Sequence, residues 1–170
     1  MLISMVFSFI IISPLSTVAI AMAIGLSGIA AGSASIGIAA TEAVLLIGTS
    51  QVNRLGIPLS IFFGGVKMMM PNMVKYPVIM VPIFITAALS GIASGIIGIG
   101  GTKESAGFGF IGMVGLINAF KFMHVDSVWL SLLLIIVAFF VVPFLIAWIL
   151  DLLLRKVIHL YRNDIFKFMG

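Results

Sequence analysis

No charged side chain occurs in the first 41 residues of the chain. Two further stretches, residues 76–102 and 127–150, are also uncharged, and each exceeds the roughly 20 apolar residues that a membrane-spanning helix requires. A soluble domain of 170 residues has too much surface for its volume to hide three such stretches. The sequence therefore predicts a chain whose solvent is lipid.

The composition supports the same class of protein and excludes others. Apolar residues make up 62% of the chain and charged residues 8%, whereas a soluble domain carries about 25% charge. This excludes a nucleic-acid-binding module, a cytosolic enzyme and a disordered tail, although the pI is about 9.8. Because the chain has no cysteine, disulfides, thiolate metal sites and a cysteine nucleophile are also excluded. We predict no cofactor, no metal site and no nucleic-acid partner.

The first uncharged stretch is long enough for two passes, or for one pass and half-helices. Pro14, beside Ser13 and Ser16, predicts a break in a membrane helix, because proline removes a backbone donor and the hydroxyls can satisfy the freed carbonyls. Small residues then recur four apart, which favours close helix packing over a ligand-binding role. These small residues are Ser27, Ala31, Ser35 and Ala39, together with Gly28 and Gly32.

Residues 105–120 are uncharged but too short and too rich in glycine to cross a bilayer. Irregular backbone at membrane depth is tolerated only where protein or a water-filled cavity covers it. We therefore predict a re-entrant hairpin at about 103–120. Residues 51–75, which carry three basic side chains and a run of methionines, are predicted to form an interfacial amphipathic segment.

The distribution of basic residues predicts the topology, because lysine and arginine concentrate in short cytoplasmic loops. If residues 76–102 leave the cytoplasm and 127–150 return, the basic residues of 51–75 and of 151–170 both lie inside, provided that 105–120 does not cross. The last segment also predicts an interfacial helix, since basic and polar side chains share one face of a helical wheel. This face holds Lys156, His159, Asn163 and Lys167, opposite Leu153, Val157, Leu160 and Phe168.

Together these patterns predict an all-α, polytopic membrane helix bundle. It should have about four or five membrane segments, a broken helix near Pro14 and the re-entrant hairpin at about 103–120. The expected organisation is a transmembrane domain at 1–150 followed by a basic amphipathic cytoplasmic tail at 151–170.

Glu42 is the first candidate functional residue, because an ionisable side chain within membrane sequence is costly to bury. It follows the small-residue helix, which places it at membrane depth or at the end of a half-helix. Its carboxyl group either has a function or is structural. In the structural case it is hydrogen-bonded to a helix terminus or paired with Lys67 or Lys75, and the sequence leaves both readings open.

Glu104 is the second candidate. It follows Gly100, Gly101 and Thr102, and glycines let backbone amides come close to a ligand. A carboxylate there could accept hydrogen bonds from sugar hydroxyls or take a proton from one. The alternative is a solvated pair of Lys103 and Glu104, each neutralising the other.

Catalytic machinery is not visible in the sequence. His124 and Asp126 could relay protons or bind a metal, but two ligands do not make a site. No Walker motif, dinucleotide fingerprint or serine-histidine triad occurs, so we predict no catalytic residues and leave open whether the chain counts as an enzyme.

Three sequence blocks resemble the enzyme IIC-like membrane family of the bacterial phosphotransferase system, in the branch that includes membrane proteins named as toxin-gene regulators. The first block is Ile12-Ser13-Pro14, which is similar to the family's Ile-Ser-Pro-Pro-Ser entry into a small-residue helix. The second is Met70-Pro71-Asn72 with Lys75, Pro77 and Pro82. The third is Ser105-Ala106-Gly107-Phe108-Gly109 followed by Gly112-Met113-Val114-Gly115.

The resemblance implies a permease in a bacterial plasma membrane, with a cytoplasmic C-terminus, that holds a sugar near the midplane until a phosphoryl-carrier subunit phosphorylates it. Family members are about twice as long, so the chain resembles their C-terminal half, pairing with a missing N-terminal half or with a second copy as a homodimer. A looser similarity of residues 102–110 to the glutamate-bearing hairpin of sugar-binding enzyme IIC proteins nominates Glu104.

The resulting candidate residues fall into two groups. The expected sugar-binding residues are Glu104, Thr102, Gly101, Ser105, Gly107, Gly109, Asn72 and Glu42. The residues expected to dock the phosphoryl carrier are Arg54, Lys67 and Lys75, for which anchoring to anionic lipid is an equal alternative. The competing hypothesis for the whole chain is a membrane-bound regulator or sensor that keeps the fold without transport and signals through its basic tail.

Overall fold

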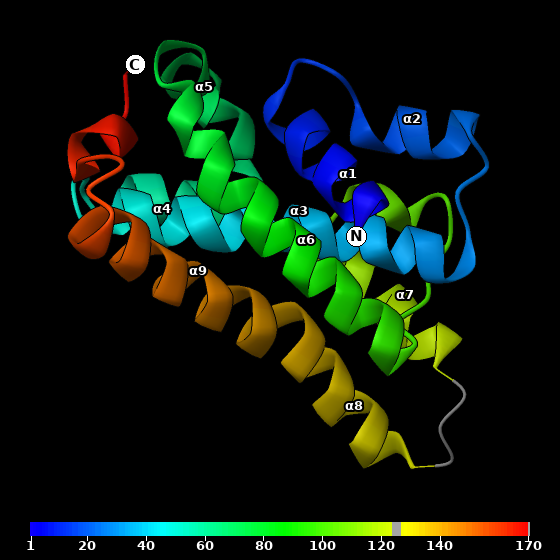
Figure 1. The fold of residues 1–170 in the computed structure, drawn as a ribbon. Helices are drawn as coiled ribbons and strands as arrows, with labels where there is room; N and C mark the ends of the chain where they lie inside the picture. Colours follow the sequence, from blue (N-terminus) through cyan, green and yellow to red (C-terminus); the bar gives the residue numbers. More distant parts are fainter. Residues whose placement is uncertain (124–126, 170) are drawn as a thin grey trace.

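The structure is a computed structural model that describes residues 1–123 and 127–169, so the candidates His124 and Asp126 lie outside it. The described residues form helices and irregular connections and contain no β-strand (Figure 1). Three helices are long and apolar enough to cross a membrane, at Gly28–Ser50, Pro77–Ile97 and Val128–Val157, and two shorter apolar helices occupy Leu2–Ile12 and Ile111–Phe122. The prediction of an all-α membrane bundle is confirmed.

Helix α3 (Gly28–Ser50) is the centre of the bundle. It packs against α1 (Leu2–Ile12), α6 (Met80–Ile97) and α9 (Val142–Leu152), and every residue from 31 to 45 is buried. Its small residues make this possible, because a Cβ atom at Gly32 would overlap the main chain of Ile99. The predicted close approach therefore occurs at Gly32, where the neighbour is the main chain that follows α6.

The helix break near Pro14 is also confirmed. Helix α1 ends at Ile12, and the hydroxyl of Ser13 donates a 2.7 Å hydrogen bond to the carbonyl oxygen of Ile10. Helix α2 (Thr17–Ala23) begins after Ser16, whose side chain accepts a hydrogen bond from the N–H of Ala19 at 3.2 Å. The serines thus satisfy backbone groups that the interruption leaves free.

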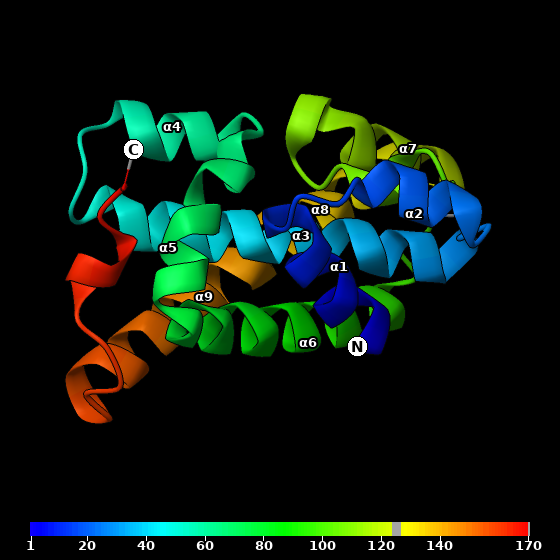
Figure 2. The same ribbon diagram turned by 90° about the horizontal axis from the view of Figure 1, so that it is seen from above.

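Residues 51–75, predicted to form an interfacial amphipathic segment, are built from short elements. They divide into helix α4 (Gly56–Phe62), a 3₁₀ turn at Gly65–Met69 and helix α5 (Met70–Lys75). Helix α4 packs along the C-terminal half of α3 and buries Pro58 and Ile61. Figure 2 shows α4 and α7 (Val114–Phe122) on the same side of α3, lying over opposite halves of it.

The last long helix joins α8 (Val128–Ile136), a π-helical turn at Val137–Val141, α9 and a second π-helical turn at Leu153–Val157. It runs antiparallel to α6, and residues 98–123 link the neighbouring ends without crossing the bundle (Figure 1). The basic regions 51–75 and 151–170 consequently lie at the same end of the bundle, as the charge pattern predicted.

The C-terminal segment is not the interfacial helix that the helical wheel predicted. The helix ends at Val157, and His159 adopts a left-handed backbone conformation with a φ of 55°, which turns the chain. Residues 158–162 are not helical, and a 3₁₀ turn follows at Asn163–Phe166. The wheel failed because Tyr161, Ile165 and Phe166 are buried against the end of the bundle.

Candidate ligand-binding site

The glycine-rich segment after α6 is largely irregular. Helix α6 ends at Gly98, whose φ of 81° is left-handed, and backbone hydrogen bonds of 2.9 and 3.0 Å then pair Gly101 with Gly28 at the start of α3. Two 3₁₀ turns, at Ser105–Gly107 and Ile111–Met113, lead into α7. This arrangement agrees with the predicted hairpin that does not cross.

Thr102 and Ser105 shape the turn within this segment. The hydroxyl of Ser105 accepts a hydrogen bond from the Thr102 N–H at 2.9 Å and donates one to the Thr102 carbonyl at 3.0 Å. The hydroxyl of Thr102 accepts a hydrogen bond from the Ser105 N–H at 3.3 Å. These two expected ligand groups, with the paired Gly101, are thus engaged within the protein.

Two glycines let the segment lie directly on its neighbours. A Cβ atom at Gly107 would lie 2.7 Å from the backbone nitrogen of Val18, and the carbonyl of Gly107 accepts a 2.8 Å hydrogen bond from the hydroxyl of Thr17. A Cβ atom at Gly109 would lie 2.7 Å from Oε2 of Glu42. Both glycines are therefore needed for close approach, and Gly109 lies beside the buried carboxyl group.

Glu42 lies in the middle of the bundle on α3 and is completely buried. Its Oε2 accepts a hydrogen bond from the N–H of Phe110 at 2.9 Å, while Oε1 has no hydrogen-bond partner among the described residues. Ser35 lies seven residues earlier, and its buried Oγ also lacks a partner in this part of the chain. Oε1 of Glu42 and Oγ of Ser35 thus both have unused hydrogen-bonding capacity in the interior, as do the buried hydroxyls of Thr86 and Ser90 on α6.

This geometry decides between the partners considered for Glu42. The carboxyl group is bonded to the backbone just before α7, as one structural reading predicted. Neither lysine pairs with it, because Lys67 donates to the carbonyls of Ser13 and Leu15 and Lys75 lies over the ring of Tyr76.

Helix α4 and the segment before α7 meet at an aromatic cluster. The ring of Phe62, the last residue of α4, lies 5.4 Å from that of Phe110, measured between ring centroids. Phe110 in turn lies 4.6 Å from Phe140 and 6.0 Å from Phe144 on the long C-terminal helix. Helix α4 and the segment before α7 therefore converge next to Glu42. Helix α4 was not predicted as a separate helix, because seven residues give too weak a periodic signal.

Glu104 lies away from this convergence, on the exposed surface. Hydrogen bonds from its own backbone N–H and from the hydroxyl of Thr102 hold the pKa of the Glu104 carboxyl below its usual value. The structure therefore does not bring the two candidate carboxyl groups together in one buried site.

Asn72 and the basic candidates lie elsewhere. Asn72 is completely buried and binds the C-terminal segment, as described below. Arg54, Lys67 and Lys75 are all exposed. The Lys67 ammonium donates to the carbonyls of Ser13 and Leu15 in the turn between α1 and α2, and partial burial lowers the pKa of Lys67.

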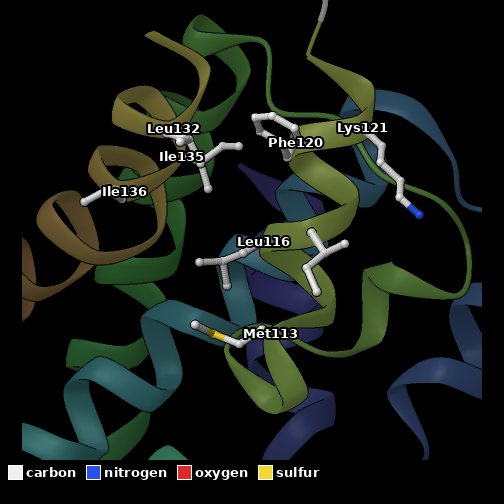
Figure 3. Close-up of a pocket in the computed structure, with 8 residues that line it drawn as sticks. Met113, Leu116, Phe120, Lys121, Leu132, Ile135 and Ile136 are labelled. Carbon is white, nitrogen blue, oxygen red and sulfur yellow. The ribbon is translucent and has the colours of Figure 1, made fainter. Parts of the chain in front are cut away.

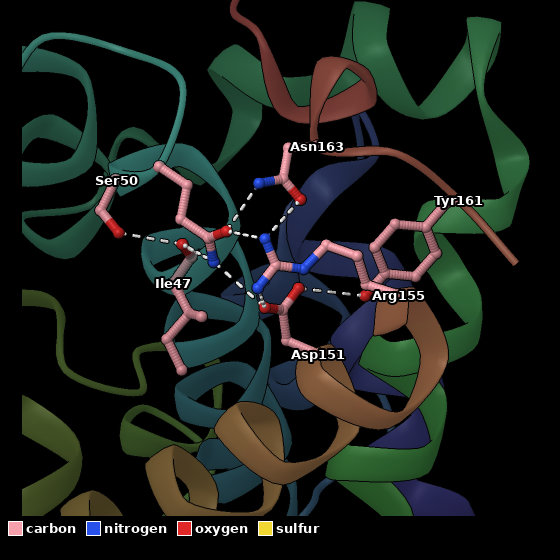
Figure 4. A network of polar contacts seen from close by, with 7 residues as sticks. Ile47, Ser50, Asp151, Arg155, Tyr161 and Asn163 are labelled. Atoms are coloured by element: carbon pink, nitrogen blue, oxygen red, sulfur yellow. Dashed lines mark hydrogen bonds and ion pairs between the residues drawn. The ribbon is translucent and has the colours of Figure 1, made fainter. Parts of the chain in front are cut away.

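A polar network joins the end of α3 to the end of the long C-terminal helix (Figure 4). Asp151 pairs with Arg155 at 3.0 Å and accepts hydrogen bonds from Gln51 at 3.1 Å and from Tyr161 at 3.4 Å. Arg155 also donates to Gln51 and to Asn163, at 2.6 and 3.0 Å. Sequence reasoning missed Gln51. Its only signal is an amide side chain directly after a buried helix.

An apolar groove of about 330 Å³ lies between α7 and α8 (Figure 3). Leu116 and Phe120 line one wall and Leu132 and Ile135 the other, with Lys121 at the edge. The groove contains none of the predicted site residues, and its lining is apolar except for Lys121.

Within residues 1–123 and 127–169, no cluster of three or more His, Asp or Glu side chains could hold a metal ion. The polar groups found at the candidate positions are a carboxyl group, hydroxyl groups and side-chain amides, and glycines bring the main chain close to them. The fold and the site therefore define a polytopic helical membrane protein whose interrupted helices meet beside a buried carboxyl group.

Residues 1–168 match the family described as "Phosphotransferase system, EIIC". Since the match covers nearly the whole chain, including most of the C-terminal segment, the protein belongs to this family, as the three sequence blocks predicted. No curated protein and no solved structure matched in the two other comparisons.

Proposed function

We propose that this protein is the sugar-binding and translocating membrane component of a phosphoenolpyruvate-dependent phosphotransferase system. The observation that carries the proposal is the convergence of α4 and the segment before α7 on Glu42. Transporters commonly place their substrate where discontinuous helices meet inside the bundle. A sugar needs many hydrogen bonds and little charge, and Glu42 Oε1 and Ser35 Oγ have unused hydrogen-bonding capacity there.

Access to Glu42 requires the segment at 109–110 to move. Gly109 lies against the carboxyl group, and the N–H of Phe110 occupies one of its oxygens. Gly98, Gly109 and Gly112 have left-handed φ angles and so provide backbone positions at which the segment can hinge. In the proposed cycle the sugar displaces the N–H of Phe110 from the Glu42 carboxylate. Glu104 lies in the same segment, six residues before Phe110, and is exposed.

The remaining parts of the proposal concern partners and orientation. The basic end of the bundle is cytoplasmic in a bacterial plasma membrane, and Arg54 and Lys75 help to dock a phosphoryl-carrier subunit there. The phosphoryl group comes from that carrier, because this chain has no cysteine and no recognised catalytic motif. A second copy or a separate N-terminal half completes the transporter.

The test is thermal unfolding of the purified chain in detergent against a panel of sugars and sugar phosphates. A ligand that binds only the folded state raises the apparent stability by mass action, by about 2.7 kcal/mol at a hundredfold excess over Kd. The variants are Glu42→Gln and Glu104→Gln, with Lys103→Gln as a matched control on the same segment.

A sugar-specific increase that Glu42→Gln abolishes and Lys103→Gln preserves is the expected result. An increase lost only in Glu104→Gln would move the sugar to the outer end of the segment. If no sugar stabilises a wild-type chain that is folded, sugar binding by this chain alone is refuted.

A membrane-bound regulator is the second candidate function, and the docked C-terminal segment favours it. Asn53 and Asn72 bind residues 165–168, as a signalling tail held in a resting position would require. This hypothesis expects deletion of residues 158–170 to abolish function while Glu42→Gln has no effect, whereas a permease expects the reverse for sugar binding.

A further inference from the structure

The end of the bundle holds the C-terminal segment in the manner of a bound peptide. Asn53 uses both ends of its carboxamide, donating to the carbonyl of Phe166 at 2.8 Å and accepting from the N–H of Phe168 at 2.8 Å. Asn72 donates to the carbonyls of Ile165 and Lys167, each at 2.7 Å. Four consecutive residues therefore have main-chain groups bonded to only two side chains.

One aromatic side chain is recognised in addition to the main chain. The ring of Phe166 occupies the place that a side chain at position 48 would take, since a Cβ atom at Gly48 would lie 2.6 Å from the ring. Phe166 is 1% exposed, and its ring packs edge-on against Tyr161 with 5.7 Å between the centroids. Gly48 thus forms a slot for a phenylalanine.

The first part of the connection to this segment, residues 158–160, is exposed, whereas Tyr161 and Asn163 after it are bonded to Asp151, Arg155 and Gln51. Ile158 and Leu160 are exposed apolar residues, and His159 between them has the left-handed φ of 55°, which costs energy in a residue other than glycine. Backbone bonds to Leu153 and Leu154 hold only the first turn. An exposed, strained connection leading to a segment bound by two amides has the features of a local opening unit.

We propose that Gly48, Asn53 and Asn72 form a peptide-recognition site whose resident ligand is residues 165–168 of this chain, and that the segment leaves the site while the helical bundle stays folded. The site binds the main chain at the end of a 3₁₀ turn and of the two residues that follow it, together with one phenylalanine ring. This inference does not depend on sugar binding.

The absence of cysteine makes a direct test possible, because a single introduced cysteine is the only thiol. Ile165→Cys places the thiol in the docked segment, and Ala147→Cys places it in α9, where Ala147 is 2% exposed. Alkylation of the folded full-length chain is measured for each variant and divided by the rate in denaturant. The result is a protection factor for the segment and one for the bundle.

The segment is expected to be protected at least tenfold less than the bundle. Adding Asn72→Ala, which removes two hydrogen bonds, should raise alkylation at position 165 by roughly tenfold and leave position 147 unchanged. Asn118→Ala is the matched control, since the side chain of Asn118 donates within α7, at 3.1 Å to the carbonyl of Val114, and binds no other described residue. Alkylation at position 147 also reports whether each variant is folded.

Recognition is tested by adding a synthetic peptide of residues 161–169, which should keep the site occupied and raise alkylation at position 165, whereas a scrambled peptide should not. Gly48→Leu fills the slot and should release the segment in the same way. Equal protection at positions 165 and 147 would overturn the independent opening. A folded chain that responds identically to both peptides would overturn the recognition site.

Discussion

The main-chain N–H of Phe110 donates a 2.9 Å hydrogen bond to Oε2 of Glu42, although the two residues are 68 positions apart. This bond joins the middle of the central helix to irregular backbone that an apolar environment would otherwise leave unsatisfied. Glu42 therefore has a structural role whether or not it also binds a ligand, and the two roles can be separated by choosing the substitution.

Replacing Glu42 by leucine should destabilise the protein more than replacing it by glutamine. Leucine leaves the Phe110 N–H buried without an acceptor, which costs about 1–3 kcal/mol, whereas glutamine keeps a carbonyl oxygen at this position. Thermal unfolding of both variants in the same detergent measures the difference. Equal stability of Glu42→Leu and Glu42→Gln would show that the hydrogen bond contributes nothing.

A single methyl group at Gly107 should be strongly unfavourable. The Cβ atom would meet the backbone of Val18, and main chain cannot move aside as a flexible side chain can, so we expect Gly107→Ala to cost about 1–3 kcal/mol. Gly95→Ala is the matched control in α6, where no neighbouring atom lies within 4 Å. Alanine favours a helix by up to about 1 kcal/mol, so the control should be neutral or slightly stabilising. If both changes have the same effect, the close contact at Gly107 is wrong.

Two acidic residues of the C-terminal region should differ in their contribution to stability. Asp151 is 6% exposed and bonded to Arg155, Gln51 and Tyr161, so Asp151→Ala leaves a partly buried cation without its partner and should cost about 3 kcal/mol. Asp164 pairs with Arg162 at 3.6 Å on the open surface, and Asp164→Ala should change stability by less than about 1 kcal/mol. Chemical denaturation of the two variants provides the comparison, and an equally large loss in Asp164→Ala would contradict it.

Tyr161 should make the protein sensitive to alkaline pH. Burial, followed by the adjacent negative charge of Asp151, raises the pKa of the Tyr161 hydroxyl well above its ordinary value of 10.0. Because the folded state resists ionisation, this stabilisation is complete below about pH 10 and is lost as the pH rises above it. The melting temperature of the wild type, followed from about pH 8 to about pH 11, should fall more steeply than that of Tyr161→Phe. Parallel curves would show that Tyr161 titrates normally.

Local features of the chain predicted much of the architecture. The uncharged stretches at 76–102 and 127–150 predicted two of the spanning helices, Pro14 predicted the break between α1 and α2, and the short glycine-rich run predicted a segment that does not cross. The third spanning helix, α3, continues past Glu42 and beyond the first uncharged stretch. The C-terminal helical wheel failed for a different reason. Periodicity describes a helix only while the helix continues, and the chain turns at His159.

Some residues of the candidate site could be nominated from the sequence, whereas the role of others depends on the fold. Glu42 could be nominated from its sequence alone, since a carboxyl group in an uncharged stretch is unusual wherever the chain folds. Glu104 could not be distinguished from an exposed loop residue, because its environment depends on how residues 98–113 leave α6. Asn72 was nominated for a sugar, but its side chain is used by residues 93 and 95 positions further along.

The sequence by itself determined that the chain is a membrane protein, that small residues let its central helix pack closely, and that its two basic regions lie at one end of the helix bundle. These properties follow from composition and spacing, which act over one helix length or less. Only the tertiary structure decided that α4 meets the segment before α7 over Glu42, and that Asn53, Asn72 and Gly48 hold the C-terminal segment. These arrangements depend on contacts between residues far apart in the chain, and the free energy of such contacts exists only when the folded backbone brings both partners together.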